Sequence, residues 1–260
     1  HLHSSKTGLL GRLAFPKSKI IYTVHGFDSI RVMYRKYLPL ERCMQGRCQA
    51  IVAVSKYDER NLKDEGITHH VSMIYNGTYS PQKLEKDPLG RAKGYAQRVL
   101  CIARLASPKR LDLFLEVAAL LPQYAFIWVG NRYPVTLEHT PNVFFMGNVP
   151  NAGAYNAYAD VFMLPSNYEG LPIVIIEALA CGKPVVASAV GGISELLDGS
   201  NGFAVENEAK VMAEKIAYIL SDRALYSRMA EAARQTYLRS FTVDKMVDGY
   251  MRIYERILAR

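Results

Sequence analysis

The sequence of 260 residues has few features of a secreted, membrane-spanning or metal-binding protein. It contains only four cysteines. No C-x-x-C pair occurs, and no cysteine–histidine cluster has the spacing of zinc ligands, which argues against a zinc site. The longest apolar stretch, residues 171–190, is interrupted by Glu177 and Lys183 and contains two prolines. It is therefore too broken to span a membrane.

The low cysteine content favours a reducing compartment, so we expect a cytoplasmic protein, with the inner face of the membrane as one location. No secretory signal is recognisable, although the sequence opens on histidine. Half of the residues are hydrophobic and 22% are charged, as in ordinary globular proteins. No nucleic-acid motif or basic stripe with interleaved aromatic residues occurs, so nucleic acid is not an expected partner.

The net charge of +8 suggests an anionic partner. Five cations fall in or near one expected helix (Arg31, Arg35, Lys36, Arg42 and Arg47). They form either a solvated face or a contact with anionic lipid headgroups or a lipid-linked phosphate. Peripheral contact with a membrane is therefore one of two alternatives.

Short β-branched runs alternate with longer amphipathic stretches, which is typical of parallel sheets covered by helices, an α/β fold. The expected strands are residues 19–24, 50–54, 71–74, 98–102, 126–129, 143–145, 161–164 and 184–187. The expected helices are residues 8–15, 31–47, 56–65, 111–121, 154–159, 173–181, 208–220, 225–240 and 243–258.

The pattern divides into two units. Residues 79–95 contain prolines and glycines without a regular period and are expected to be a linker. We expect a partial first unit over residues 1–78 and a second unit over residues 96–240. Residues 241–260 are expected to form a helix that packs back toward the first unit.

The most informative segment joins an expected strand to an expected helix and reads S-N-Y-E-G-L-P-I-V-I-I-E-A over residues 166–178. Pro172 suits a first helical turn, and Gly170 would let a ligand approach the backbone. The amides from Leu171 onward are free donors at a helix N-terminus, which suits phosphate or sugar oxygens.

Two glutamates in this segment are candidate ligand-binding groups. Glu177 lies in an apolar helix and must find donors, either ribose hydroxyls or a basic side chain such as Lys183. Glu169 lies at the edge of the loop, where it would bond a sugar hydroxyl or stabilise the helix start by its charge.

Two cations, Arg104 and Lys109, follow the expected strand 98–102. Parallel sheets bind ligands at the carboxyl ends of their strands, and Arg and Lys neutralise the charge on a leaving diphosphate. The alternative is a basic loop beside a helix start, where the helix dipole disfavours cations.

The E-G-L-P sequence at Glu169, the second glutamate after seven intervening residues, and the continuation E-A-L-A-C-G-K-P-V-V-A resemble the signature of family 4 glycosyltransferases. The resemblance implies the GT-B fold, with two Rossmann-like parallel-sheet units. It also implies that Glu169 contacts the donor sugar and Glu177 the nucleotide ribose. Arg104 and Lys109 match the family pattern R-L-x-x-x-K, which contacts the diphosphate.

Further segments resemble the same family. Gly147, Asn148 and Val149 resemble the loop whose backbone reads the nucleobase. Residues 190–196 resemble a G-G-x-x-E turn beside the donor site, or are simply a tight turn. Residues 76–77, N-G, resemble the interdomain segment, although a type I′ turn explains them equally well. His25 would bond the donor or orient the acceptor hydroxyl, or it is structural.

The resemblance implies retaining transfer of a sugar from a nucleotide diphosphate to a saccharide or polyprenyl-linked acceptor, in bacterial surface polysaccharide synthesis. No D-x-D pair for Mg²⁺ or Mn²⁺ occurs, so a metal-independent reaction without a cofactor is expected. The leaving phosphate would help to deprotonate the acceptor, and no enzyme nucleophile is nominated.

The first unit has only about three expected strands, and the opening strand and glycine-rich turn of the family are missing. The chain is thus expected to be a fragment or a reduced form. Two alternative functions remain: a nucleotide-sugar-binding fragment without transfer activity, and a nucleotide-sugar epimerase of the same fold.

Overall fold

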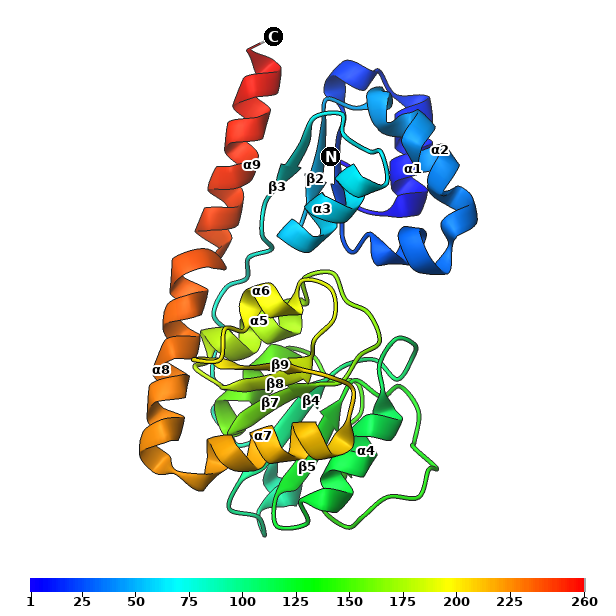
Figure 1. Ribbon diagram of the computed structural model, residues 1–260. Helices are drawn as coiled ribbons and strands as arrows, with labels where there is room; N and C mark the ends of the chain where they lie inside the picture. Colours follow the sequence, from blue (N-terminus) through cyan, green and yellow to red (C-terminus); the bar gives the residue numbers. More distant parts are fainter. Residues whose placement is uncertain (260) are drawn as a thin grey trace.

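The structure is a computed structural model that describes residues 1–259, the side chain of Arg91 excepted. It contains two parallel sheets, one in each of two α/β units (Figure 1). The first sheet has the order β1-β2-β3, formed by Ile21–Val24, Ala50–Ala53 and Val71–Met73. The second has the order β6-β5-β4-β7-β8-β9, formed by Val143–Phe145, Ala125–Val129, Arg98–Ile102, Val161–Leu164, Val185–Ser188 and Gly202–Val205. The α/β fold with two parallel-sheet units is confirmed.

The first sheet is covered on both faces because successive side chains of a strand point to opposite sides. Tyr22 and Ile51 face a layer that contains α1 (Ser5–Ala14), α2 (Leu38–Met44) and α3 (Lys56–Asp64). Ile21 and Val52 face the last helix, α9 (Val243–Leu258), through Ile253. In Figure 1, α9 lies on the opposite side of this sheet from α1 and α2. Strand order and cover therefore follow from the continuous apolar runs.

The second unit has the larger core. Its central strands are buried along almost their whole length, and Trp128, Phe126 and Phe162 are fully buried. Helix α4 (Leu111–Leu120) packs beside α7 (Ala209–Ser221), and α5 (Ile173–Ala180) packs beside α8 (Arg223–Ser240). Leu89 and Ala92, from the segment expected to be a linker, are also buried in this core.

The expected helix over residues 31–47 is wrong. The segment consists of a π-helical turn, Ser29–Met33, a 3-10 turn, Arg35–Tyr37, then α2, and another 3-10 turn, Gln45–Arg47. Tyr34 leaves the helical region, with φ −117° and ψ 43°, and Pro39 fits only the first turn of the following helix. The five expected cations therefore do not share one helical face.

Two elements of the second unit, close to its last strand in sequence, were not predicted. Strand β9 lies where no element was predicted, and a short helix, α6 (Ile193–Leu196), follows the glycine pair of the expected tight turn. Gly202 begins β9 with φ +153°, and a Cβ there would collide with the backbone of Val185. The expected helix at residues 154–159 is a 3-10 helix, Ala152–Tyr158. Within residues 1–259, none of the helices combines the length and the apolar character needed to cross a bilayer.

Candidate active site

A hollow of about 380 Å³ lies at the carboxyl ends of strands in the second sheet. The loop after β4, the loop after β6 and the start of α5 all line it. Six of the side chains predicted from the sequence contribute to its lining: Arg104, Lys109, Asn148, Val149, Glu169 and Pro172. Loops far apart in sequence converge here because parallel strands all end at the same edge of the sheet.

Lys109 and Glu169 meet inside this hollow. The Lys109 ammonium forms an ion pair with Glu169 Oε1, and the two side chains are only 17% and 12% exposed. Ser166 Oγ donates a second hydrogen bond to the same oxygen, at 2.6 Å. Both loops are held in place through their backbones, since Lys109 and Ser166 form an antiparallel bridge. A charged donor and a charged acceptor are thus prepositioned next to each other.

Arg104 is the other cation of this loop, and its side chain is exposed. In the described part of the chain it forms no ion pair. It lines the hollow and also a neighbouring one of about 440 Å³, whose lining includes Arg132 and Tyr133. Its guanidinium group is therefore available to an anionic ligand, whereas Lys109 must leave Glu169 to bind one.

The start of α5 supplies backbone donors. Pro172 is the residue that precedes the helix, with φ −71° and ψ 118°, rather than part of its first turn as predicted, and the helix begins at the predicted Ile173. The next two residues, Ile173 and Val174, line the hollow. Amides in a first helical turn have no partner within the helix, so these two are available to phosphate or sugar oxygens.

Gly170 and Leu171 serve a different purpose from the predicted one. A Cβ on Gly170 would lie 2.8 Å from the Cα of Gly26 in the first unit, so the close approach is made by protein backbone and not by a ligand. The Leu171 carbonyl accepts a hydrogen bond from Asn76 Nδ2 at 3.0 Å. Neither residue lines the hollow. They join the two units directly behind it.

Glu177 lies beside the hollow, in a recess of about 250 Å³. A Cβ on Gly153 would come within 2.9 Å of the Glu177 carboxyl carbon, so this glycine makes room for the carboxyl group. Burial raises the pKa of Glu177. Among the described residues, Glu177 forms no ion pair with Lys183, whose own pKa is lowered by burial. The alternative of a structural ion pair with Lys183 is therefore not realised.

Gly147 shapes the loop after β6 and does not itself line the hollow. It has φ +79°, which glycine adopts without strain. Its N–H donates to Asn131 Oδ1 and its carbonyl accepts from the Gly130 N–H, both at 2.8 Å. These bonds position Asn148 and Val149 at the rim.

His25 belongs to the first unit and follows β1. It lies next to Gly170, whose added Cβ would come within 3.3 Å of the His25 carbonyl carbon. Its Nε2 is hydrogen-bonded to Nδ1 of His3 at 3.1 Å. The surrounding protein, and secondarily His3, lower the pKa of His25 below 6.5. His25 is near the segment that carries Glu169 but does not line the hollow.

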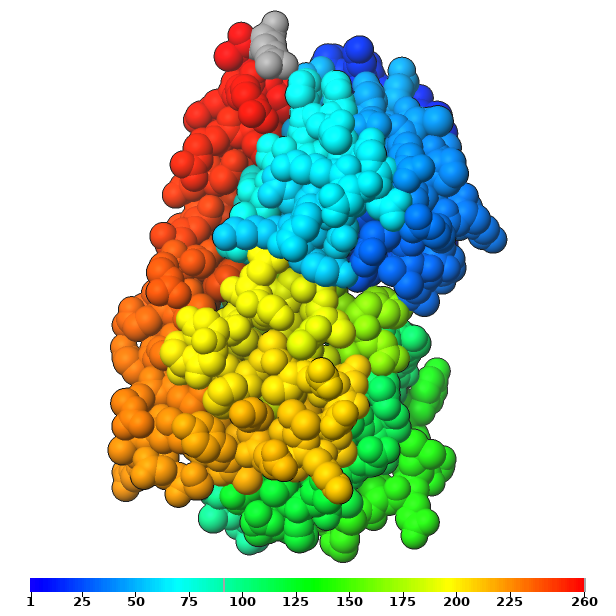
Figure 2. Space-filling view, viewed as in Figure 1, coloured from blue at the N-terminus to red at the C-terminus, as the bar shows by residue number. Residues whose placement is uncertain are grey.

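Glu195, the glutamate of the G-G-x-x-E segment, joins the two units. The Glu195 carboxylate accepts hydrogen bonds from the Lys56 and Tyr57 N–H groups, at 2.9 and 2.8 Å, and from Tyr75 Oη at 2.9 Å. It therefore caps α3 of the first unit from α6 of the second. Figure 2 shows these two segments in contact. Neither Asn76 nor Gly77 has a positive φ, so the alternative of a type I′ turn there is wrong.

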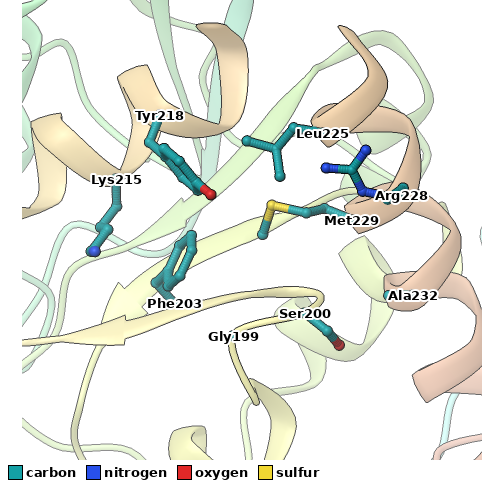
Figure 3. Close-up of a pocket in the computed structure, with 9 residues that line it drawn as sticks. All are labelled: Gly199, Ser200, Phe203, Lys215, Tyr218, Leu225, Arg228, Met229 and Ala232. Atoms are coloured by element: carbon teal, nitrogen blue, oxygen red, sulfur yellow. The ribbon is translucent and has the colours of Figure 1, made fainter. Parts of the chain in front are cut away.

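A separate hollow of about 490 Å³ lies between β9, α7 and α8, and Figure 3 shows its lining. Phe203, Tyr218, Leu225 and Met229 make most of it apolar. It contains none of the residues predicted to bind the donor. Within residues 1–259, no group of three or more His, Cys, Asp or Glu side chains is placed to hold a metal ion.

Comparison with known proteins places this geometry in a family. A family model described as Glycosyltransferase Family 4 matches residues 1–79, and one described as Glycosyl transferases group 1 matches residues 96–222. This chain is a family 4 glycosyltransferase. The glycosyltransferase is 29% identical to the O-antigen biosynthesis glycosyltransferase WbnH of Escherichia coli, over 98% of this chain and 74% of WbnH.

Another relative of this glycosyltransferase is the UDP-Gal:alpha-D-GlcNAc-diphosphoundecaprenol alpha-1,3-galactosyltransferase of Escherichia coli. It is 25% identical over 98% of this chain and 74% of its own length. Among solved structures, sucrose-phosphate synthase from Thermosynechococcus elongatus has a TM-score of 0.86 at 22% identity, over 99% of this chain and 73% of that one. Anabaena HepE in complex with UDP-glucose has a TM-score of 0.85 at 23% identity, over 99% and 77%. The GT-B fold is thereby confirmed.

Proposed function

We propose that this glycosyltransferase moves a sugar, with retention of configuration, from a nucleotide diphosphate to a saccharide or polyprenyl-linked acceptor. The observation that supports the proposal most directly is the convergence of Arg104, Lys109, Glu169 and the free amides of α5 on one hollow. A nucleotide diphosphate sugar requires this combination, since its phosphates need cations and N–H donors while its sugar needs a hydroxyl acceptor.

We propose that the Lys109–Glu169 ion pair changes partners when the donor binds. A diphosphate near Arg104 attracts the Lys109 ammonium by charge. The Glu169 carboxylate, still held by Ser166, then accepts a hydrogen bond from a sugar hydroxyl in place of the lysine. The Lys109 charge stays paired, now with the diphosphate, and the Glu169 carboxylate stays hydrogen-bonded, which avoids the cost of a buried carboxylate without partners.

In the proposed reaction, Arg104 and Lys109 neutralise the charge that develops on the leaving diphosphate. The bond from the anomeric carbon to the phosphate oxygen breaks, and the acceptor oxygen bonds to the anomeric carbon on the same face of the sugar. The departing phosphate takes the acceptor proton. His25 orients the acceptor hydroxyl or the donor, and Glu177, in the adjoining recess, bonds the ribose. A metal-independent reaction remains part of the proposal.

We further propose surface polysaccharide synthesis at the inner face of the membrane. The E. coli relatives bear names of O-antigen and diphosphoundecaprenol-linked reactions, which supports this assignment. Transfer to an acceptor distinguishes this function from an epimerase, whose products form without an acceptor.

Calorimetry with UDP, GDP and ADP first identifies the preferred base. The phosphate role of Arg104 is then tested with the nucleoside and the nucleoside diphosphate of that base, uridine and UDP if the base is uracil. Arg104→Ala should weaken the nucleoside diphosphate by about tenfold or more while leaving the nucleoside nearly unchanged. Arg110→Ala is the matched control, because this cation of the same loop is already paired with Asp112 at 2.6 Å. Equal losses for uridine and UDP in the Arg104 variant would show that its role is not phosphate binding.

A further inference from the structure

The first unit meets the second at two backbone contacts directly behind the candidate active site. A Cβ added to Gly170 would lie 2.8 Å from the Cα of Gly26. A Cβ added to Gly192 would lie 2.8 Å from the Cβ of Ser55. Gly170 and Gly192 are also joined to each other, since the Gly192 N–H donates to the Gly170 carbonyl at 2.8 Å. The first unit therefore packs at two points against one connected stretch of backbone.

Both of these points are hydrogen-bonded to a single buried carboxylate, that of Asp58 in α3. Its Oδ1 accepts from the N–H of Phe27, the residue after Gly26, at 2.8 Å. Its Oδ2 accepts from Ser55 Oγ at 3.0 Å. The side chains of Asp58, Phe27 and Ser55 are all buried, and Figure 1 shows α3 on the side of the first unit that faces α6. Asp58 thus ties the two contact points together inside the first unit.

This carboxylate does more than cap its own helix. Ser55 is the N-cap residue of α3, and its Oγ accepts from the Asp58 N–H at 3.0 Å. In a capping box, the acidic side chain three residues after the N-cap bonds back to the N–H of the N-cap residue. Asp58 bonds instead to Phe27, which lies 31 residues earlier in the chain. Helix capping alone therefore does not explain where the Asp58 carboxylate points.

The charge of Asp58 is not neutralised by a cation. Among the described residues Asp58 forms no ion pair. Burial raises the pKa of Asp58 to about 6, so the group is ionised at pH 7. A buried carboxylate without a cation costs stability, but it offers two acceptor oxygens to two separate donors. The charge therefore lowers stability while it joins the two contact points.

We infer that Asp58 is a positioning residue, which holds the turn of residues 25–27 in place against Gly170. Through this turn it sets the position of His25. Through Gly170 it sets the position of the neighbouring Glu169 carboxylate and of the amides at the start of α5. The inference rests on the proposed function, in which these groups contact the substrates, and it adds a residue of the first unit that touches no substrate itself.

Three variants of the full chain separate positioning from stability. Asp58→Ala removes both acceptor oxygens. Asp58→Asn is the conservative variant, because its amide oxygen can accept from the Phe27 N–H while its Nδ2 donates to Ser55 Oγ. Leu62→Ala is the matched control: Leu62 is buried on the same helix, so its truncation destabilises the first unit but leaves both hydrogen bonds of Asp58 in place.

Two measurements are made on each variant: calorimetry with UDP, GDP and ADP, and amide hydrogen exchange by NMR. Asp58→Ala should weaken the preferred nucleotide by about 3- to 30-fold and should speed exchange of the Gly192 amide, although both sites belong to the second unit. Asp58→Asn should behave like the parent in both measurements. Leu62→Ala should speed exchange of the Ile51 amide, which donates to the His70 carbonyl in the first sheet, without changing nucleotide affinity or Gly192 exchange.

The inference is overturned if Asp58→Ala binds the nucleotide like the parent or leaves Gly192 exchange unchanged. It is also overturned if Leu62→Ala matches Asp58→Ala, which would show a purely structural role, or if Asp58→Asn restores neither value. Should Asp58→Ala not fold, Ser55→Ala removes one of the two bonds and must change both values in the same direction. A parent protein that binds none of the three nucleotides would instead refute the proposed function, whereas Gly192 exchange would still decide the role of Asp58.

Discussion

The Glu195 carboxylate links the two units, and its removal should weaken the first unit most. Glu195→Ala deletes three hydrogen bonds to a charged acceptor, from the Lys56 and Tyr57 amides and from Tyr75 Oη. Hydrogen bonds to charged groups are worth about 1.5–3 kcal/mol each when no replacement exists. Lys56 is exposed, so water replaces its bond. The two remaining bonds predict a loss of about 3–6 kcal/mol, or roughly 9–18 °C in Tm at about 3 °C per kcal/mol.

The single tryptophan makes the assay specific to one unit. Trp128 is fully buried in the second unit, so its fluorescence reports unfolding of that unit alone, whereas far-ultraviolet circular dichroism reports both. In Glu195→Ala, the dichroism transition in urea should precede the fluorescence transition, because the three-stranded first unit loses its support. Glu195→Gln keeps an acceptor but loses the charge and should show about half of the effect.

Glu208→Ala is the matched control. Glu208 directly precedes a helix, α7, but its side chain makes no capping hydrogen bond. Its removal should change Tm by no more than about 1–2 °C. If Glu195→Ala and Glu208→Ala lower Tm equally, or if the two spectroscopic transitions stay coincident in Glu195→Ala, the cap does not stabilise the first unit and the argument is wrong.

Three further changes follow from packing and burial. Gly170→Ala places a Cβ 2.8 Å from backbone and should lower both Tm and UDP affinity, whereas Gly94→Ala, with nothing within 4 Å, should alter neither. Ile253→Ala should cost about 2–4 kcal/mol in urea unfolding because it removes the main contact of α9 with the first sheet, while Met251→Ala, 46% exposed, should cost under about 0.5 kcal/mol. Burial raises the pKa of Asp58 to about 6, so the folded state binds this proton more tightly than the unfolded state. As the pH rises from about 4 to about 6, the contribution of Asp58 to the free energy of unfolding therefore decreases by on the order of 2–3 kcal/mol. Asp58→Asn should flatten that part of the pH–stability profile and leave stability at pH 7 equal or higher; an unchanged slope would contradict the assignment.

The sequence predicts the elements whose apolar residues follow a regular pattern. Residues 161–164 and 243–258 match β7 and α9 to the residue, because a continuous apolar run and a stripe of period 3.6 have few alternatives. The candidate site is predictable for a related reason. In a parallel sheet, any polar loop that follows a strand lies at the same edge, so Arg104 and Glu169 come together once both strands are found.

Interactions that depend on distant partners were not predictable. Residues 31–47 have helix-forming composition, but Val32, Met33 and Tyr37 face solvent, so no packing holds the first half of the segment in one continuous helix. The glycine at position 170 permits close approach of either a ligand or a backbone, and only the position of Gly26, far away in sequence, decides between them. The G-G-x-x-E segment marks Glu195 but does not indicate its partners, because its donors lie more than 100 residues earlier.

The segment from Glu169 to Pro172 has two sides with different partners. The Glu169 carboxylate faces the hollow, while its carbonyl oxygen lies against Gly191; next to it, Gly170 meets Gly26 and the Leu171 carbonyl accepts from Asn76. A shift of the first unit is therefore expected to move the backbone that carries the carboxylate proposed to bind the donor sugar. We expect the position of the first unit and the affinity for the donor sugar to be coupled through residues 169–172, even though the first unit supplies none of the lining of the hollow.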